Sequence, residues 1–217
     1  MKFLSTLSIV LLGSFSISSA LAKQCITSWE LKSSGFTVGT TKEVLNIKDD
    51  GSLKLTSDFT PNAALKIFGL DTVRRSVILN PQQSLISRQE TIGSGEETKK
   101  ASWKFLKEQT YNRIVKDETV ETIKFESGKK IIDSTIFPYM FYLGMLNSPQ
   151  MNVKVFGFDS AYDAAIVLNA TEKTRIDFTG VKSKGYVIVN EDRYPQYFSF
   201  TKDGKTVEGI QNGWQCN

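Results

Sequence analysis

The chain of 217 residues contains no histidine and only two cysteines. Without an imidazole, a serine or cysteine nucleophile has no histidine base, and the usual zinc and non-haem iron sites lose a ligand. The sequence also lacks a phosphate-binding Gly-x-x-x-x-Gly-Lys or Gly-x-Gly-x-x-Gly pattern between a predicted strand and a predicted helix. These absences favour a protein that is not an enzyme, and they predict neither a metal nor a cofactor.

The N-terminus has the pattern of a secretory signal peptide. A basic start precedes an apolar run over residues 7–17, and small residues lead up to a cleavage position after Ala22. We therefore expect residues 1–22 to be the signal peptide and residues 23–217 to form one β-rich domain. The residues before Cys25 are not the small ones that lipid attachment requires, so we expect a soluble protein that is periplasmic in a bacterium.

The rest of the chain is mildly basic and contains no further membrane-spanning run. The formal net charge of +4 falls to 4 − 1 = +3 when Lys2 leaves with the leader. The lysine pairs lie beside glycine or serine in predicted turns, which is typical of solvated hairpin tips and does not indicate a nucleic-acid surface. We expect no transmembrane segment in the mature chain, because no later apolar run reaches the length of a spanning helix.

Cys25 and Cys216 lie near the two ends of the expected mature chain. In an oxidising compartment an even pair of cysteines is usually bridged, which predicts a disulfide between them. The flanking residues alternate as in strands, so the first and last strands are expected to pair antiparallel. This pairing places Cys25 opposite Cys216 and Thr27 opposite Trp214.

Short alternating segments separated by turn residues predict strands along most of the chain. Residues 63–70 fit either a strand or a helical turn. The predicted strands are residues 26–31, 36–47, 52–59, 73–79, 85–92, 100–106, 111–116, 120–126, 152–159, 165–170, 174–179, 185–190, 196–202 and 206–210.

One strongly apolar segment does not have a strand pattern. No charged side chain lies between Asp133 and Lys154, while Pro138 suits the first turn of a helix and Gly144 suits its end. A short helix at about 136–147 that is apolar all round should be buried. The fold class predicted is therefore mainly β, a curved antiparallel sheet or partly open β-barrel wrapped around this one short helix.

Three groups of residues also carry a family resemblance. They are Trp29-x-Leu31 followed by residues 35–39, the 133–142 stretch with Phe137-Pro138-Tyr139, and Arg193-Tyr194-Pro195 before an aromatic strand. Together they resemble landmarks of the DUF3108-like family of exported bacterial proteins, a domain of unknown function. The resemblance implies a curved antiparallel sheet and an envelope location, and it brings no catalytic residues.

The candidates for catalysis are isolated. Ser127 and Lys130 have the Ser-x-x-Lys spacing of serine–lysine enzymes, but they lie between a strand and the apolar segment without companion motifs. The neighbouring carboxylates Glu96-Glu97 and Glu191-Asp192 fit solvent-facing turns better than an acid and base pair. We assign no catalytic residue.

The flexible thioethers and broad rings of the apolar segment suit an apolar ligand held between the helix and the sheet. The same residues also suit a simple core. The candidate ligand-binding residues are Phe137, Tyr139, Met140, Phe141, Tyr142, Met145 and Trp103.

The function expected is a periplasmic, non-enzymatic envelope protein that binds a lipid or another amphiphile. Two alternatives stay open: an envelope scaffold that binds a protein partner through a sheet edge or its loops, and a hydrolase that uses carboxylates or a serine–lysine pair.

Overall fold

The computed structural model describes residues 21–67, 69, 71–93, 98–106, 110–115, 118–124, 129–146, 148–157, 160–168 and 174–217. Most of the predicted signal peptide lies outside these ranges, so its cleavage stays a prediction. Within the same ranges, no helix is long and apolar enough to cross a membrane.

The described chain is dominated by strands. Each predicted strand overlaps a strand of the structure. Residues 63–70, which fitted either a strand or a helical turn, contain the short helix α1 (Ala63–Ile67). The strands are β1 (Leu21–Ser33), β2 (Phe36–Lys48), β3 (Leu53–Pro61), β4 (Val73–Leu79), β5 (Leu85–Ile92), β6 (Lys99–Leu106), β7 (Thr110–Val115), β8 (Glu118–Lys124), β9 (Lys130–Asp133), β10 (Gln150–Gly157), β11 (Ser160–Leu168), β12 (Arg175–Gly180), β13 (Ser183–Val189), β14 (Pro195–Lys202) and β15 (Lys205–Cys216).

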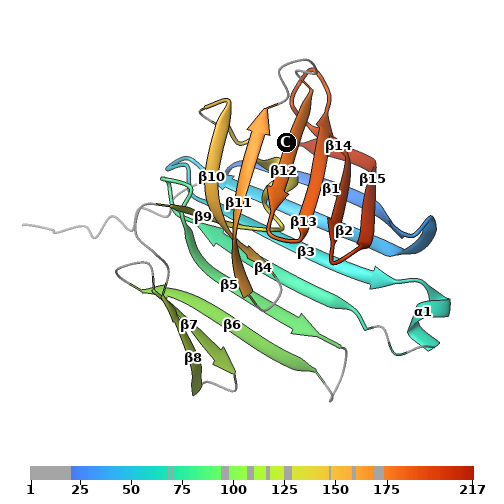
Figure 1. The fold of residues 1–217 in the computed structure, drawn as a ribbon, viewed down its shortest axis with the longest axis horizontal. Coiled ribbons are helices and arrows are strands. Elements are labelled where there is room, and N and C mark those ends of the chain that lie inside the picture. Colours follow the sequence, from blue (N-terminus) through green and yellow to red (C-terminus); the bar gives the residue numbers. More distant parts are fainter. Residues whose placement is uncertain are drawn as a thin grey trace, which may run out of the picture.

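All these strands form a single curved sheet. Their order is β8-β7-β6-β5-β4-β3-β2-β1-β15-β14-β13-β12-β11-β10-β9, and β8 and β9 are its two edges. Neighbours are antiparallel except for β9 and β10, which are parallel. In Figure 1, β10–β15 rise from the part of the sheet formed by β2–β5, and β6–β8 extend to the lower left. The predicted fold class, a curved and partly open barrel-like sheet, is confirmed.

The first and last strands pair in the predicted register. Cys25 lies opposite Cys216 and Thr27 lies opposite Trp214. The Sγ atoms of Cys25 and Cys216 are bonded at 2.06 Å across a sequence separation of 191. The sheet is thereby continuous from one end of the described chain to the other.

Side chains alternate across the sheet, as the period of two in a strand requires. On β2, Thr41, Glu43 and Leu45 are buried, while the residues between them are exposed or half-buried. On β3, Leu53, Leu55 and Ser57 face the same interior. The core therefore lies on the concave face of the sheet.

Residues 134–146, which we call the central segment, lie in this interior. Ile136, Tyr139 and Met140 have no exposed surface, and Met145 is 2% exposed. The segment is buried as predicted, but its helix is shorter than 136–147: one 3-10 turn over Phe137–Tyr139, followed by turns up to Gly144. The aromatic residues here are modest helix formers, so packing stabilises the segment together with short-range backbone hydrogen bonds, such as that of 2.9 Å from the Leu143 N–H to the Tyr139 carbonyl oxygen.

Strand β9 was not predicted from the sequence. It has four residues, pairs in parallel with β10, and leads directly into the central segment. A strand this short carries too few alternating positions to be recognised as a pattern.

Two inward-facing glycines let aromatic rings lie flat on the sheet. Gly209 is opposite Phe198 and Gly185 is opposite Phe200. A Cβ atom added at Gly209 would overlap the Phe198 ring, and one at Gly185 would meet the Phe200 ring at 2.8 Å. Glycine is therefore needed at these positions for the rings to fit.

The disulfide should contribute to stability through the unfolded chain. Thiol titration of denatured, unreduced protein is expected to find no free cysteine. On the loop-entropy model, a link across most of the chain stabilises the fold by about 5 kcal/mol, with smaller values common in practice. Urea unfolding with and without reductant measures the difference. Two reactive thiols per chain in the unreduced protein would refute the bridge.

Candidate functional site

The sequence-predicted ligand residues divide into two groups. Five of them are buried core residues: Phe137, Tyr139, Met140, Met145 and Trp103. The other two, Phe141 and Tyr142, are half-buried at the edge of this core. Ligand binding by these residues stays a prediction, and Tyr142 alone among them lines either of the pockets described below.

Aromatic contacts fill the interior around the central segment. The Phe137 ring centroid lies 5.2 Å from that of Phe178, and the Tyr139 centroid lies 5.9 Å from that of Trp214. Trp103 packs edge-on to Phe156 at 5.8 Å on the other side of the core. Distances of this size are those of packed aromatic pairs, so these rings form a core.

A row of polar side chains crosses the inner face of the sheet. Glu43 on β2 lies opposite Ser57 on β3, Ser57 opposite Arg75 on β4, and Arg75 opposite Glu90 on β5. Glu43 and Ser57 are buried, and Arg75 and Glu90 are half-buried. The sequence analysis did not identify this row. The available signal was a glutamate at an inward position of β2, between Thr41 and Leu45.

Glu43 is the most enclosed member of the row. Its Oε2 accepts a hydrogen bond of 3.0 Å from Trp29 Nε1 and another from the Tyr139 hydroxyl. Burial raises the pKa of Glu43 above its ordinary value, although the hydrogen bonds from Tyr139, Ser57 and Trp29 oppose this rise. Burial and the neighbouring Glu43 likewise raise the pKa of Tyr139. The pair ties the central segment to β2.

A cluster of charged side chains links β5 to β9. Arg88 donates to Asp133 Oδ2 at 3.2 Å and to Glu90 Oε2 at 3.0 Å, and Arg75 donates to Glu90 Oε2 at 2.6 Å. The side chains of Arg88 and Asp133 are 1% and 0% exposed. Burial raises the pKa of Glu90, but the charges and hydrogen bonds of both arginines outweigh burial and lower it overall. Each charge thus has a partner, as buried charges require.

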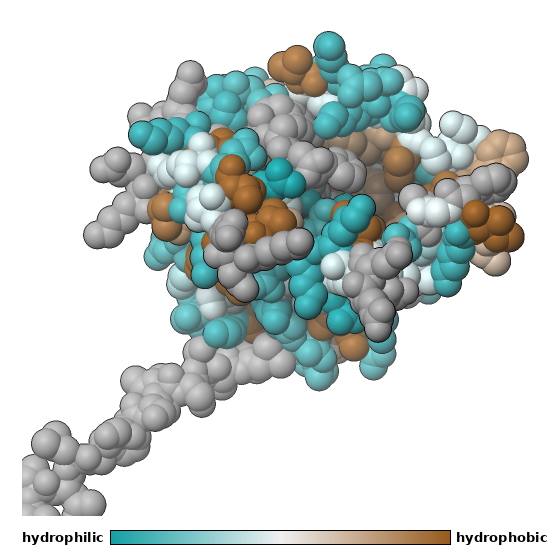
Figure 2. Space-filling view, turned by 90° about the horizontal axis from the view of Figure 1, so that it is seen from below, coloured by the Kyte–Doolittle hydropathy of each residue, from teal (hydrophilic) through white to brown (hydrophobic). Residues whose placement is uncertain are grey.

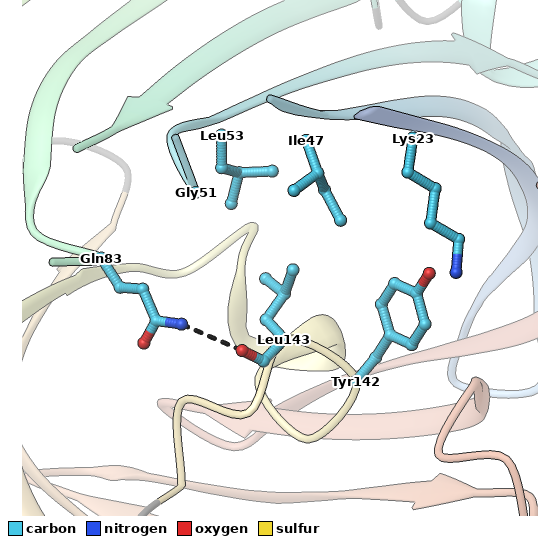
Figure 3. Close-up of a pocket in the computed structure, with 7 residues that line it drawn as sticks. All are labelled: Lys23, Ile47, Gly51, Leu53, Gln83, Tyr142 and Leu143. Atoms are coloured by element: carbon cyan, nitrogen blue, oxygen red, sulfur yellow. Dashed lines mark hydrogen bonds between the residues drawn. The ribbon is translucent and has the colours of Figure 1, made fainter. Parts of the chain in front are cut away.

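A pocket of about 340 Å³ opens where the central segment meets the ends of β1 to β3. Figure 3 shows Ile47 and Leu53 pointing into it from the sheet, with Tyr142 and Leu143 on the opposite side. Gln83 closes one side through a hydrogen bond of 2.9 Å from its amide to the Leu143 carbonyl oxygen. The walls are mainly apolar.

Lys23 supplies the positive charge of this pocket. Its Nζ lies 5.0 Å from the centroid of the Tyr142 ring, and a hydrogen bond with Tyr142 raises the pKa of Lys23. The Tyr142 hydroxyl also lies 3.3 Å from the Cys25 sulfur. The pocket therefore combines apolar walls with one cation beside the disulfide.

A second hollow, of about 370 Å³, lies outside β10 to β12. Asp163 there contacts Lys129 at 2.9 Å and Lys154 at 3.2 Å. Because all three charges already pair with one another near the surface, this hollow offers little to a ligand.

Of the candidate catalytic groups, the structure describes Lys130, Glu191 and Asp192. Ser127, Glu96 and Glu97 lie outside the described ranges, and Glu191 and Asp192 are exposed. Lys130 donates a hydrogen bond of 3.3 Å to Gln83 Oε1. The described residues also contain no group of three potential metal ligands.

No protein-family model matches this chain, and no curated protein matches it by sequence. Among solved structures, it is similar to a β-barrel-like protein of domain of unknown function DUF1849 from Brucella abortus, with a TM-score of 0.55 and 6% identity. That match covers 91% of this chain and 98% of the other. The likeness shows the fold alone.

A DUF1089 family protein from Pseudomonas aeruginosa is also similar, with a TM-score of 0.41 and 9% identity over 78% of this chain and 87% of the other. The Brucella abortus structure belongs to a family other than the DUF3108-like one. The narrower family resemblance seen in the sequence therefore stays an expectation.

The raised pKa of Glu43 predicts a pH dependence of stability. Between its ordinary value of 4.5 and the higher folded value, the folded protein keeps a proton that the unfolded chain releases. The free energy of unfolding should therefore fall as pH rises through this range, by up to about 1.4 kcal/mol per pH unit. Glu43→Gln should remove this slope in urea unfolding between pH 5 and about 8.

A matched variant is Glu208→Gln, because Glu208 also accepts a hydrogen bond from a tyrosine, Tyr197, but is only half-buried. It should keep the slope of the original protein. If Glu43→Gln and the original protein lose stability equally as pH rises, Glu43 is ionised in the folded state throughout and the assignment is wrong.

Proposed function

We propose that this protein binds an amphiphile with an anionic head group in the pocket between the central segment and the ends of β1 to β3. The observation that carries the proposal is the combination of the apolar side chains Ile47, Leu53 and Leu143 with the Lys23 ammonium in one cavity. Ligand pockets are typically concave and mostly apolar, with a few polar groups that orient the ligand.

The dimensions restrict the ligand. A volume of about 340 Å³ is near the lower end of the range for small-molecule pockets. The cavity therefore suits a short acyl chain, or the head-group end of a longer one whose remainder stays outside. Lys23 would pair with a carboxylate or phosphate. Gln83, on the opposite side, already donates to Leu143 and accepts from Lys130, so it closes the pocket.

We further propose that the protein is exported and acts in the cell envelope, without catalysis. The N-terminal leader pattern and the disulfide between Cys25 and Cys216 support an oxidising compartment. The sequence has no histidine to act as the base for a serine or cysteine nucleophile, and this favours binding over hydrolysis.

Amphiphile binding can be measured directly with delipidated protein and dansylated undecanoic acid. The fluorescence titration should give saturable uptake, and native mass spectrometry should show one bound laurate when lauric acid is added. Lys23→Ala should weaken binding about tenfold, because one charge-assisted contact is lost. Leu143→Trp should abolish it by filling the cavity.

Lys48→Ala provides the matched control, since Lys48 is an exposed lysine close to the pocket on β2. It should bind like the original protein. The proposal is wrong if neither probe binds, or if Lys23→Ala and Lys48→Ala have equal effects.

A partner-binding role is a second candidate, favoured by the open edge of β8. Among the described residues β8 pairs only with β7, and most of its side chains are exposed. A partner strand added there would use the free backbone groups of this edge. Chemical cross-linking in cells should then join Lys124 of β8 to a partner, while the exposed Lys54 of β3 should give no such product. Absence of Lys124 products would count against this role.

A further inference from the structure

The most exposed large hydrophobic residues of the described chain lie at one end of the sheet. Ile67 is 84% exposed, Phe36 is 78% exposed and Val181 is 69% exposed, whereas the next value in the described ranges is 54%. Phe36 is the first residue of β2, Ile67 is the last residue of the short helix α1, and Val181 lies in the turn between β12 and β13. Three such side chains exposed to solvent at the same end of the sheet indicate an interaction surface.

Strand order brings these three positions to the same end. Strands β3, β2, β1, β15, β14, β13 and β12 are consecutive neighbours. Ser33, at the end of β1, pairs with Val207 of β15, and Lys202, at the end of β14, pairs with Ser183 of β13. The β1–β2, β12–β13 and β14–β15 turns and α1 therefore lie at the same end of these strands, which we call the mouth.

The mouth is rigidly built. Ser34 and Gly35 both have positive φ, as in the tight hairpin turn that precedes Phe36. Asn62 caps α1 by accepting a hydrogen bond of 2.9 Å from the Leu65 N–H, and its amide donates to the Thr37 carbonyl at 2.5 Å. The helix that carries Ile67 is thus fixed beside the hairpin that carries Phe36.

Apolar side chains continue from the mouth into the interior. Phe59, Phe198 and Phe200 are half-buried and lie at inward positions near these strand ends. Figure 2, which views the molecule from below, shows a hollow to the right of the centre, with hydrophobic side chains in it and around it.

The charge around the mouth is positive. Residues 33–36, 61–73, 180–184 and 202–205 contain five lysines and two aspartates, a net charge of 5 − 2 = +3. The lysines are Lys66, Lys182, Lys184, Lys202 and Lys205, and the aspartates are Asp71 and Asp203. Exposed apolar tips among lysines are the combination found on proteins that insert shallowly into anionic lipid surfaces.

We infer that the mouth docks on an anionic lipid membrane, with Phe36, Ile67 and Val181 inserted among the acyl chains and the lysines at the head groups. Apolar insertion and electrostatic attraction are both needed, because either one alone gives weak and reversible binding. This surface is separate from the Lys23 pocket, which lies at the opposite strand ends. Membrane docking and ligand binding in the pocket can therefore be tested separately, and either proposal can be wrong without the other.

Vesicle flotation tests the docking with protein purified after export, its N-terminus established by mass spectrometry so that the apolar leader does not contribute. The protein should bind vesicles of phosphatidylglycerol and phosphatidylcholine, bind pure phosphatidylcholine vesicles weakly, and dissociate in high salt. Phe36→Ser and Ile67→Ser should each reduce the partition coefficient about tenfold. Lys66→Glu and Lys205→Glu should each reduce it about fivefold or more.

Matched controls are Ile86→Ser, which removes a 40% exposed isoleucine from β5, and Lys54→Glu, which reverses an exposed charge on β3. Both should bind like the original protein. A Phe36→Trp variant should also be quenched by brominated acyl chains, and Ile86→Trp should not. The inference is overturned if the original protein ignores anionic vesicles, or if the mouth variants and the controls bind equally.

The same variants separate this inference from the proposed ligand. Uptake of dansylated undecanoic acid from solution should be unchanged in Phe36→Ser and Ile67→Ser. Loss of vesicle binding with normal uptake supports the docking surface, whereas binding of a protein partner in place of vesicles would overturn it.

Discussion

The pairing of β1 with β15 is the interaction on which the rest of the structure depends. The sheet consists of two runs of strands, β8 to β1 and β15 to β9, and among the described residues this pair is the hydrogen-bonded junction between them. Its register determines which side chains of both runs face inward, because a shift of one residue exchanges the two faces of a strand. The central segment is then covered from both sides.

The sequence predicted this junction because its residues carry two independent signals. Cys25 and Cys216 suggest a link between the chain ends, and alternation around Thr27 and Trp214 fixes the register. The buried position of the central segment was also predictable, because exposing a long uncharged, apolar segment to water is unfavourable. Its conformation was not, because a buried segment of this length can satisfy its backbone by turns as well as by a helix.

The polar interior could not be predicted for a different physical reason. Arg88 and Glu90 alternate on β5, and in a sequence such residues indicate a solvated face. They face inward because Asp133, which is 45 residues further along from Arg88, supplies the opposite charge. A buried charge becomes acceptable only when its partner is in place, so the evidence lies in a long-range contact and not in the local pattern.

The junction between the chain ends also constrains the order of events as the protein is made. The partner of β1 is the 12-residue strand β15, so this edge of β1 has no partner strand until β15 has been synthesised. All other neighbouring strands of the sheet are consecutive in the chain, whereas pairing β1 with β15 closes a loop across almost the whole described chain, which is entropically costly. Until that loop closes, a chaperone that binds unpaired strand edges would find a binding site on β1.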